Sequence, residues 1–362
     1  MSITAIVLAA GHGTRMRSDR PKPLHRICGR PMVLHVIHAL EQVAPQRTAV
    51  VVGHAAEQVT KKVVELAPAW ANVTFAEQLH QAGTGDAAAV GLAAIGGDDY
   101  ADDAHVIVVP GDTPLLTAAT IDELVASHVA SGNAATLLTS RLADPTGYGR
   151  IVRHRDGRVL RVVEQRDADP AEQAIDEICT SIYVFRRDLL GPALRNLTPD
   201  NAQGELYLTD VVAGLAGMGH RVGTVDAPAT ETQGVNDRWQ LALAERELRH
   251  RTNRRWLLAG VTMLDPRQTF IDVTVRLGRD VTLYPGTILQ GDTVVGDDTD
   301  IGPDTQLDSC AVGSACSVSH TVGHDAEIGD RARVGPYAFL PPGSAVPAGL
   351  TTGPFYTAPA PH

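Results

Sequence analysis

A six-residue spacing of aliphatic side chains in the last third of the chain constrains its fold more than any other feature. One uninterrupted run consists of Ile271, Leu277, Leu283, Leu289, Val295, Ile301 and Leu307. A second run, displaced by three residues, consists of Cys310, Cys316, Val322, Ile328, Val334, Leu340 and Val346. Aliphatic residues that recur every six positions beside small ones are typical of a parallel β-helix. The pattern therefore predicts a β-helix of hexapeptide repeats over residues 263–350, with one loop insertion or corner adjustment between the runs.

The first two-thirds of the chain follow a different pattern, in which short β-branched segments alternate with amphipathic ones. The segments typical of strands are 4–10, 47–53, 72–77, 105–112 and 134–140. Those typical of helices are 31–43, 55–66, 84–95 and 118–130. Apolar strands separated by helices predict an α/β domain over residues 1–235, with a Rossmann-like, mostly parallel sheet covered by helices on both faces. We expect a connecting helix over 236–262 and an irregular Pro- and Gly-rich tail over 351–362.

The composition narrows the functional classes. A net charge of −11 argues against a nucleic-acid partner held by phosphate electrostatics, although a local pocket can still be positive. No apolar stretch approaches the roughly 18 residues of a membrane helix, and residues 1–10 lack the features of a signal peptide. The four cysteines show neither metal-site spacing nor the density of a disulfide framework. We therefore expect a cytoplasmic protein with reduced thiols, in which Cys310 and Cys316 fill the β-helix core.

The glycine-bearing segment LAAGHGTRMRSDRPKPL, residues 8–24, directly follows the first expected strand. It differs from the dinucleotide fingerprint G-x-G-x-x-G because Met16 occupies the position of the third glycine. Instead it carries Arg15, whose guanidinium can bind two phosphate oxygens, and Lys22, whose ammonium is a point charge. A loop whose backbone N–H groups can approach phosphates, together with two cations, indicates a triphosphate ligand. The alternative is a glycine-rich turn with solvated cations.

This segment closely resembles the signature of sugar-1-phosphate nucleotidylyltransferases, in particular the uridylyltransferase half of the bifunctional N-acetylglucosamine-1-phosphate uridylyltransferase/glucosamine-1-phosphate acetyltransferase family. Further matching blocks follow in the same order: EQLHQAGTGDA, VVPGDTPLL, DPTGYGRIV, VVEQRDA, NAQGELYLTDV and GVNDRWQLA. The resemblance spans nearly the whole chain and implies a left-handed β-helix. It also implies Mg²⁺-dependent transfer of a uridylyl group from UTP to a sugar 1-phosphate, with N-acetylglucosamine 1-phosphate as the leading acceptor and pyrophosphate released. A homotrimer assembled through the β-helix is implied as well.

The resemblance also implies roles for particular residues. The implied nucleotide and catalytic contacts are Leu8, Ala9, Ala10, Gly11, Gly13, Arg15 and Lys22, and the implied base contacts are Gln78, Gly83 and Thr84. Asp112 and Asn236 are implied as Mg²⁺ ligands, and the implied sugar contacts are Gly149, Glu164 and Cys179. Structural alternatives exist, since Asp112 could cap a turn, Asn236 could cap a helix and Glu164 could be a surface acid. In GELYLTD we expect Glu205, Tyr207 and Asp210 to pack behind the site.

Departures from the family pattern leave the acceptor open. Cys179 stands where the family has an asparagine on the strand lining the sugar pocket, and a thiol is a poor hydrogen-bonding substitute for an amide. The two interpretations are a changed sugar preference and a thiol that fills the core. Asp86, where the family often has a histidine, and Pro110, before the Gly-Asp pair, also favour a changed sugar preference. Pro341 replaces the arginine that begins the family's acetyltransferase site, and the later coils of that site are missing, so we expect no acetyltransferase activity.

Three rival functions stay open. The same chemistry could act on another hexose, amino-sugar or cyclitol phosphate, and dTTP could replace UTP. A β-helix acyltransferase would require a catalytic histidine in the coils, where His320 and His324 lie without the supporting residues. A non-catalytic trimer that binds a nucleotide sugar would have no need for the charged set Arg15, Lys22, Asp112 and Asn236.

Overall fold

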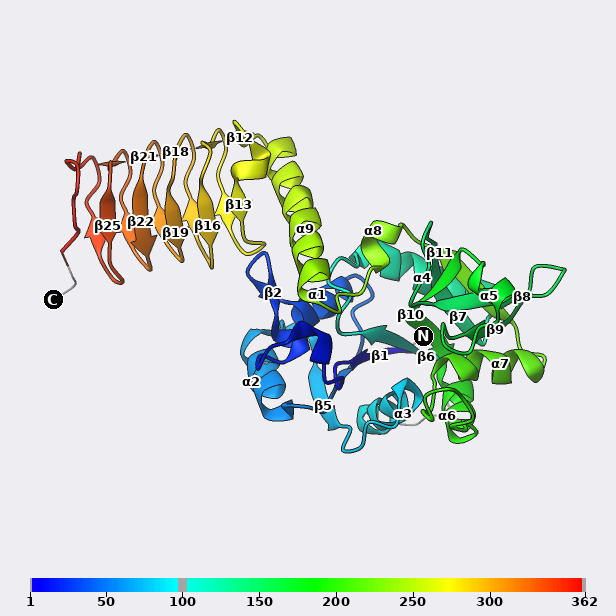
Figure 1. The fold of residues 1–362 in the computed structure, drawn as a ribbon. Helices are drawn as coiled ribbons and strands as arrows, with labels where there is room; N and C mark the ends of the chain where they lie inside the picture. Colours follow the sequence, from blue (N-terminus) through cyan, green and yellow to red (C-terminus); the bar gives the residue numbers. More distant parts are fainter. Residues whose placement is uncertain (1, 97–102, 360–362) are drawn as a thin grey trace. The chain divides into compact units, whose positions relative to one another are not determined.

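The computed structural model describes residues 2–96 and 103–359 (Figure 1). The chain divides into two compact units, the first containing Met1–His25 and Pro31–Leu241, the second containing Arg26–Arg30 and Ala242–His362. The short segment Arg26–Arg30 belongs to the second unit although it lies within the range expected for the first domain. Its Cys28 N–H donates to Glu245 Oε2 at 2.7 Å, and its Cys28 carbonyl oxygen accepts from the Val273 N–H at 3.1 Å.

The first unit is built on a mostly parallel sheet with strand order β11–β7–β10–β6–β1–β4–β5 (Figure 1). These strands are β1 (Ser2–Leu8), β4 (Thr48–Val52), β5 (Val73–Glu77), β6 (Ala104–Pro110), β7 (Ala135–Arg141), β10 (Glu177–Arg186) and β11 (Val222–Asp226). Every strand expected from the sequence is present close to its expected bounds. The alternation of segments did not predict β10, although the resemblance implied a strand at Cys179; β10 runs antiparallel to β6 and β7. An antiparallel hairpin, β8 (Gly149–Arg153) and β9 (Val159–Val163), pairs with β10.

Helices of the first unit cover both faces of this sheet (Figure 1). The helices of this unit are α1 (Met32–Ala39), α2 (Ala56–Leu66), α3 (Thr84–Ile95), α4 (Ala118–Ser131), α5 (Pro170–Gln173), α6 (Arg187–Arg195), α7 (Thr209–Gly217) and α8 (Ala229–Thr232). The next helix, α9 (Arg238–Leu258), begins in the first unit and continues into the second. Short strands β2 (Arg26–Ile27) and β3 (Arg30–Pro31) and 3₁₀ turns at Thr14–Met16, Lys22–Leu24, Ala69–Ala71 and Pro266–Gln268 complete the elements outside the β-helix. Within the part of the chain that the structure describes, no helix combines the length and the apolar composition needed to cross a bilayer.

Two separate cores hold the first unit together, because successive residues of a strand point to opposite faces. Val7 of β1 packs in one core with Ile37 of α1. Its neighbour Ile6 packs in the other core with Ala88 of α3. Strands buried on both faces explain the nearly continuous apolar segments in the sequence. The arrangement brings the carboxyl ends of β1 and β6, which are parallel neighbours, to the same edge of the sheet.

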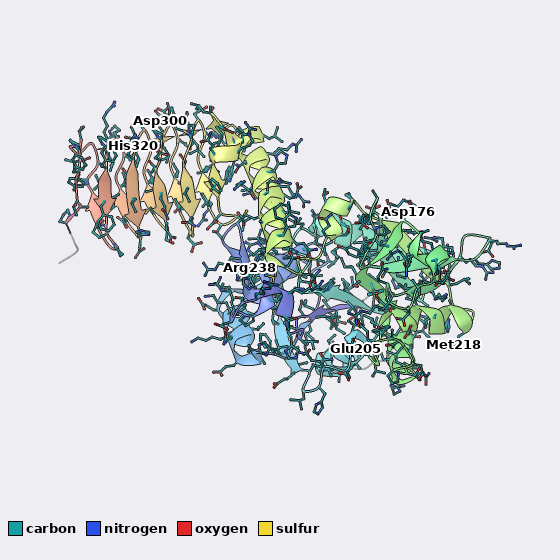
Figure 2. All side chains as sticks on the ribbon, in the orientation of Figure 1. Asp176, Glu205, Met218, Arg238, Asp300 and His320 are labelled. Atoms are coloured by element: carbon teal, nitrogen blue, oxygen red, sulfur yellow. The ribbon has the colours of Figure 1, made fainter. Side chains whose placement is uncertain are left out.

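The second unit contains a left-handed parallel β-helix with three faces, as the sequence predicts (Figure 1). One face stacks β12 (Thr262–Met263), β15 (Thr282–Leu283), β18 (Asp300–Ile301), β21 (Ser317–Val318) and β24 (Arg333–Val334). The next stacks β13 (Phe270–Ile271), β16 (Ile288–Gln290), β19 (Gln306–Asp308), β22 (Thr321–His324) and β25 (Ala338–Leu340). The third stacks β14 (Arg276–Leu277), β17 (Val294–Val295), β20 (Ala311–Val312), β23 (Glu327–Ile328) and β26 (Ala345–Val346). On each coil polar residues such as Asp300 point outward (Figure 2), while Ile301 beside it is buried.

The expectation of one loop insertion or one corner adjustment between two inward runs is wrong. Val322, expected inside, is 39% exposed, and Gly323 instead stacks in register between Leu307 and Leu340. The inward positions after Leu307 are Val312, Val318, Gly323, Ile328, Val334, Leu340 and Val346. The displacement therefore arises from three turns that are each one residue shorter, rather than from one longer loop.

A second buried position lies two residues before each inward aliphatic residue. In the earlier coils it holds Thr287, Thr293, Thr299 and Thr305, all completely buried. In the next coil the same position holds Cys310 and Cys316, which are buried with free thiols. Their expected role as core residues is confirmed by this burial. The last residues of the expected tail, 360–362, lie outside the described residues.

Candidate active site

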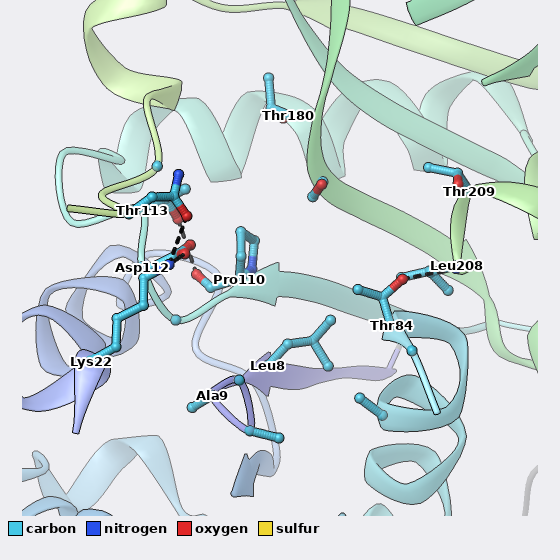
Figure 3. Close-up of a pocket in the computed structure, with 18 of the residues that line it drawn as sticks. Leu8, Ala9, Lys22, Thr84, Pro110, Asp112, Thr113, Thr180, Leu208 and Thr209 are labelled. Carbon is cyan, nitrogen blue, oxygen red and sulfur yellow. Dashed lines mark hydrogen bonds and ion pairs between the residues drawn. The ribbon is translucent and has the colours of Figure 1, made fainter. Parts of the chain in front are cut away.

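A cavity of about 570 Å³ opens at the edge of the first unit where the parallel strands end (Figure 3). The residues that end and follow β1 and β6, 8–11 and 110–113, form part of its wall. The Gly111 N–H donates to the Leu8 carbonyl oxygen at 2.8 Å and so holds the two segments together. Ligands of open α/β sheets bind at this edge.

The glycine-bearing loop packs against the lysine that follows it. Gly13 has a left-handed backbone with φ of 61°, and a Cβ there would lie 2.5 Å from the Lys22 Cβ. Glycine at position 13 therefore lets the loop close on Lys22. Met16, at the position where a dinucleotide fingerprint has its third glycine, is buried and anchors the loop. Arg15 beside it lines the cavity.

Charged and amide side chains from distant parts of the first unit meet at one end of the cavity. The Lys22 ammonium donates to Asp112 Oδ2 and, at 2.9 Å, to Asn236 Oδ1 (Figure 3). Arg15 donates to the same Asn236 oxygen at 2.9 Å. The Val235 N–H donates to the Asp112 carbonyl oxygen at 2.8 Å and keeps the two chain segments together. Both side-chain oxygens thus face the cations in and after the glycine-bearing loop.

The two capping alternatives do not describe this geometry. The N-cap of α9 is Asp237, whose Oδ1 accepts from the Gln240 N–H at 2.8 Å, so Asn236 is not the cap. The turn at residues 110–113 is closed by the Thr113 hydroxyl, which donates to the Pro110 carbonyl oxygen at 3.0 Å. The Asp112 carboxylate is therefore available to the cavity.

The pair of oxygens suits a divalent cation. Asp112 Oδ2 and Asn236 Oδ1 accept from one ammonium, so a positive charge is already stabilised between them. Over residues 2–96 and 103–359 no group of three or more His, Cys, Asp or Glu side chains could hold a metal ion. One carboxylate and one amide oxygen, completed by phosphate oxygens and water, are ligands that Mg²⁺ prefers.

The residues expected at the nucleotide base lie on another wall of the cavity. The Gln78 amide nitrogen donates to the Gly83 carbonyl oxygen at 3.1 Å and to Asp86 Oδ2 at 2.7 Å. Gly83 has φ of 114°, and a Cβ there would lie 2.5 Å from a backbone carbonyl oxygen, so glycine is required. The Thr84 hydroxyl accepts from the Leu208 N–H at 3.0 Å (Figure 3).

A carboxyl group and a tyrosine belong to the part of the cavity wall where the resemblance expects the sugar. Glu164 Oε1 accepts from the Thr209 hydroxyl at 3.1 Å, and burial raises the pKa of Glu164. A Cβ on Gly149 would lie 3.5 Å from both Glu164 oxygens and 2.9 Å from a valine side chain, which explains glycine beside this carboxyl. The Tyr207 hydroxyl is buried without a hydrogen-bond partner among the described residues. Burial raises the pKa of Tyr207 to about 12, so this hydroxyl keeps its proton.

Comparison with known proteins assigns the fold around this cavity. Residues 5–208 match the model of the MobA-like NTP transferase domain. The chain belongs to this family. It is 50% identical over 287 residues to the bifunctional protein GlmU of Thermobifida fusca, a match that covers 79% of this chain and 59% of that protein. The GlmU proteins of Streptomyces avermitilis and Mycobacterium tuberculosis are 50% and 48% identical over 288 and 289 residues, covering 79% of this chain and 58% of each. This transferase therefore spans about three-fifths of the length of these relatives.

The resemblance drawn from the motifs is confirmed, and the chain is a nucleotidyltransferase. The cavity brings together most of the residues that the resemblance implies: Leu8, Ala9, Ala10, Gly11, Arg15, Lys22, Gln78, Gly83, Thr84, Asp112, Glu164 and Asn236. Gly13, Gly149 and Cys179 do not line it. The two glycines act on its shape, because they leave space beside Lys22 and Glu164.

Cys179 lies behind the wall of the transferase's cavity. Its thiol is buried and donates to the Tyr183 hydroxyl oxygen at 3.2 Å, and burial raises its pKa to about 12. β10 changes register between Cys179 and Tyr183, and Ser181 in this bulge has φ of 61°. The bulge presents Thr180, Ser181 and Tyr183 to the cavity instead. This placement favours the interpretation of Cys179 as a core residue that acts on the cavity through Tyr183.

Several lining residues of the transferase were missed by sequence reasoning. Glu205 and Tyr207, expected behind the site, are part of the wall. Gln81, between Gln78 and Gly83, donates from its side chain to the Ala10 carbonyl oxygen at 2.7 Å. Gln81 and the GELYLTD residues lie inside motif blocks, so proximity to those motifs could have identified them.

Proposed function

We propose that this nucleotidyltransferase transfers a uridylyl group from UTP to a sugar 1-phosphate in the presence of Mg²⁺, with N-acetylglucosamine 1-phosphate as the preferred acceptor. The observation that carries the proposal is the single cavity with phosphate-binding cations at one end and the Glu164 carboxyl at the other. This arrangement fits a nucleoside triphosphate and a phosphorylated sugar bound side by side.

In the proposed reaction an oxygen of the sugar phosphate attacks the α-phosphorus of UTP. The new P–O bond forms as the bond between the α-phosphorus and the bridging oxygen breaks, and that oxygen leaves with pyrophosphate. Arg15 and Lys22 bind the phosphates and stabilise the charge that develops on their oxygens. Asp112 and Asn236 would hold Mg²⁺, which neutralises phosphate charge when bound. Positioning of both substrates in one cavity supplies a further part of the rate enhancement.

The preference for an acceptor depends on the part of the cavity that contains Glu164. Glu164 offers oxygens that accept hydrogen bonds from sugar hydroxyls, and Tyr207 forms part of the same wall. The alternative acceptor, another hexose, amino-sugar or cyclitol phosphate, rests on the replacement of the family's asparagine by Cys179. UTP is preferred over dTTP only on the resemblance.

We also propose that the β-helix carries no acetyltransferase activity, because Pro341 stands in the place of the family's arginine. His320 and His324 belong to the β-helix, and the His320 ring lies 5.3 Å from that of Tyr337. The four cysteines are free and buried, which supports a reducing compartment such as the cytoplasm.

The test is pyrophosphate release with Mg²⁺, UTP and a panel of sugar 1-phosphates, compared with the same mixtures containing EDTA. We expect N-acetylglucosamine 1-phosphate to give the fastest release, EDTA to abolish it, and the Cys179→Asn variant to change it little. The alternative acceptor would be established if another sugar 1-phosphate were the best acceptor for the parent and N-acetylglucosamine 1-phosphate became the best acceptor for the variant. CoA release from acetyl-CoA and glucosamine 1-phosphate should not exceed the background.

A further inference from the structure

The side chain of Gln78 has only one orientation compatible with its neighbours. Its amide nitrogen lies 3.1 Å from the Gly83 carbonyl oxygen and 2.7 Å from Asp86 Oδ2. A carbonyl and a carboxylate only accept hydrogen bonds, so both must face the NH₂ group rather than the amide oxygen. The two N–H donors of Gln78 are thereby used within the protein.

The amide oxygen of Gln78 is left for a ligand. Gln78 lines the cavity and is 6% exposed, and Oε1 makes no hydrogen bond with another described residue. An acceptor so placed favours a bound group that donates a hydrogen bond, and its desolvation by a ligand without a donor is costly. A base bound in this part of the cavity must therefore present an N–H group to the Gln78 oxygen.

This requirement distinguishes the pyrimidine bases. Uracil and thymine carry a hydrogen on N3, whereas N3 of cytosine has a lone pair that would meet the Gln78 oxygen. We propose that Asp86 is a positioning residue for base selection, because its carboxylate holds the Gln78 amide with the oxygen toward N3–H. The inference rests on the proposed function and identifies the nucleotide class as an imide base.

Asp86 also has a purely structural explanation. It lies in the first turn of α3, where a negative charge interacts favourably with the helix N-terminus. In that case its removal would lower stability without changing the choice of base. The two roles therefore differ in the ratio of kcat/KM for UTP to kcat/KM for CTP.

The experiment measures this ratio by pyrophosphate release with the preferred sugar 1-phosphate in the parent, Asp86→Asn, Gln78→Leu and the double variant. A charge-assisted hydrogen bond exceeds a neutral one by enough to lower the ratio about tenfold in Asp86→Asn, mainly through KM for UTP. In the Gln78→Leu background the second substitution should have no further effect, because Asp86 acts through Gln78. The control is Glu77→Gln, which removes an exposed carboxylate one residue before Gln78.

An unchanged ratio in Asp86→Asn, or in Gln78→Leu should Asp86→Asn fail to fold, overturns the inference. A further loss in the double variant does so as well, since Asp86 would then act by another route. If the folded parent releases no pyrophosphate with any nucleotide and sugar phosphate, the proposed function itself fails, and with it this inference.

Discussion

At the scale of single residues, one ammonium connects the side chains at one end of the cavity. Lys22 binds Asp112 and Asn236, which come from segments about 90 and 214 positions away in the chain. The motif order predicted that these residues converge, because strands of a parallel sheet end at one edge. It could not predict that Cys179 lies behind Tyr183, because that depends on a bulge at Ser181, a residue without any feature in the sequence that favours φ of 61°.

Replacing Lys22 by methionine should lower kcat/KM by about 100-fold or more, since removal of one donor to a developing phosphate charge costs this much in comparable sites. The measurement is steady-state pyrophosphate release with saturating sugar phosphate. Lys62→Met is the matched control, because Lys62 pairs with Glu65 on the surface of α2. Equal activities of the two variants would contradict the role of Lys22.

At the scale of elements, the six-residue period predicted the β-helix but did not predict its three shortened turns. Val322 is apolar and lies in phase with the second run, so nothing in the sequence distinguished it from the inward residue. The register is set by glycine at position 323 and by the backbone pairing on both sides. The buried threonines also stabilise the coils, because their hydroxyls form hydrogen bonds with backbone groups inside them.

Thr299 is an example of such a buried threonine. Its hydroxyl donates to the Gly313 carbonyl oxygen at 3.0 Å and accepts from the Cys316 N–H at 3.1 Å. Thr299→Val should lower the free energy of unfolding by about 1–3 kcal/mol because a buried N–H loses its acceptor. Urea denaturation measures the change, and Thr282→Val, at an outward position of β15, is the control. A loss no larger than that of the control would contradict the role of the hydroxyl.

A histidine joins α4, β6 and β7. His128 is completely buried, its Nδ1 lies 2.9 Å from the Thr136 hydroxyl and its Nε2 lies 3.1 Å from His105 Nδ1. Burial, with smaller contributions from His105 and Arg186, lowers the pKa of His128 to about 4. The unfolded chain therefore takes up the proton first as the pH falls below about 6.5.

We expect stability to be insensitive to this group above pH 6.5 and to fall between pH 6.5 and 4, by on the order of 3 kcal/mol. Urea denaturation at a series of pH values measures the slope, which His128→Gln should reduce. The exposed His250→Gln variant provides the comparison. An identical slope in the parent and His128→Gln would show that the buried ring does not control acid stability.

At the scale of the whole molecule, one face of the β-helix differs from the other two. Its outward row is aligned by the strand register and consists of Phe270, Ile288, Gln306, Val322 and Phe339. Exposed apolar rows mark contact surfaces. We propose that this row contributes to the contacts of a homotrimer.

The particle in solution should have three times the chain mass of 38.3 kDa when measured by light scattering. Aspartate at both Val322 and Phe339 should reduce the mass to that of a single chain, because charged groups are costly to bury. Ser317→Asp, on another face, should leave the trimer intact. A parent that sediments as a single chain at micromolar concentration would contradict the assembly.

The central claim is that one cavity joins a nucleotide to a sugar phosphate. The most direct measurement follows UTP and N-acetylglucosamine 1-phosphate by ³¹P NMR in the presence of Mg²⁺ and the parent protein. The account predicts that the signals of a nucleoside diphosphate sugar and of pyrophosphate grow together in equal amounts, and that both grow about 100-fold more slowly with Lys22→Met. Pyrophosphate that forms without a nucleotide sugar, or an unchanged spectrum with every sugar phosphate and nucleotide supplied, would contradict it.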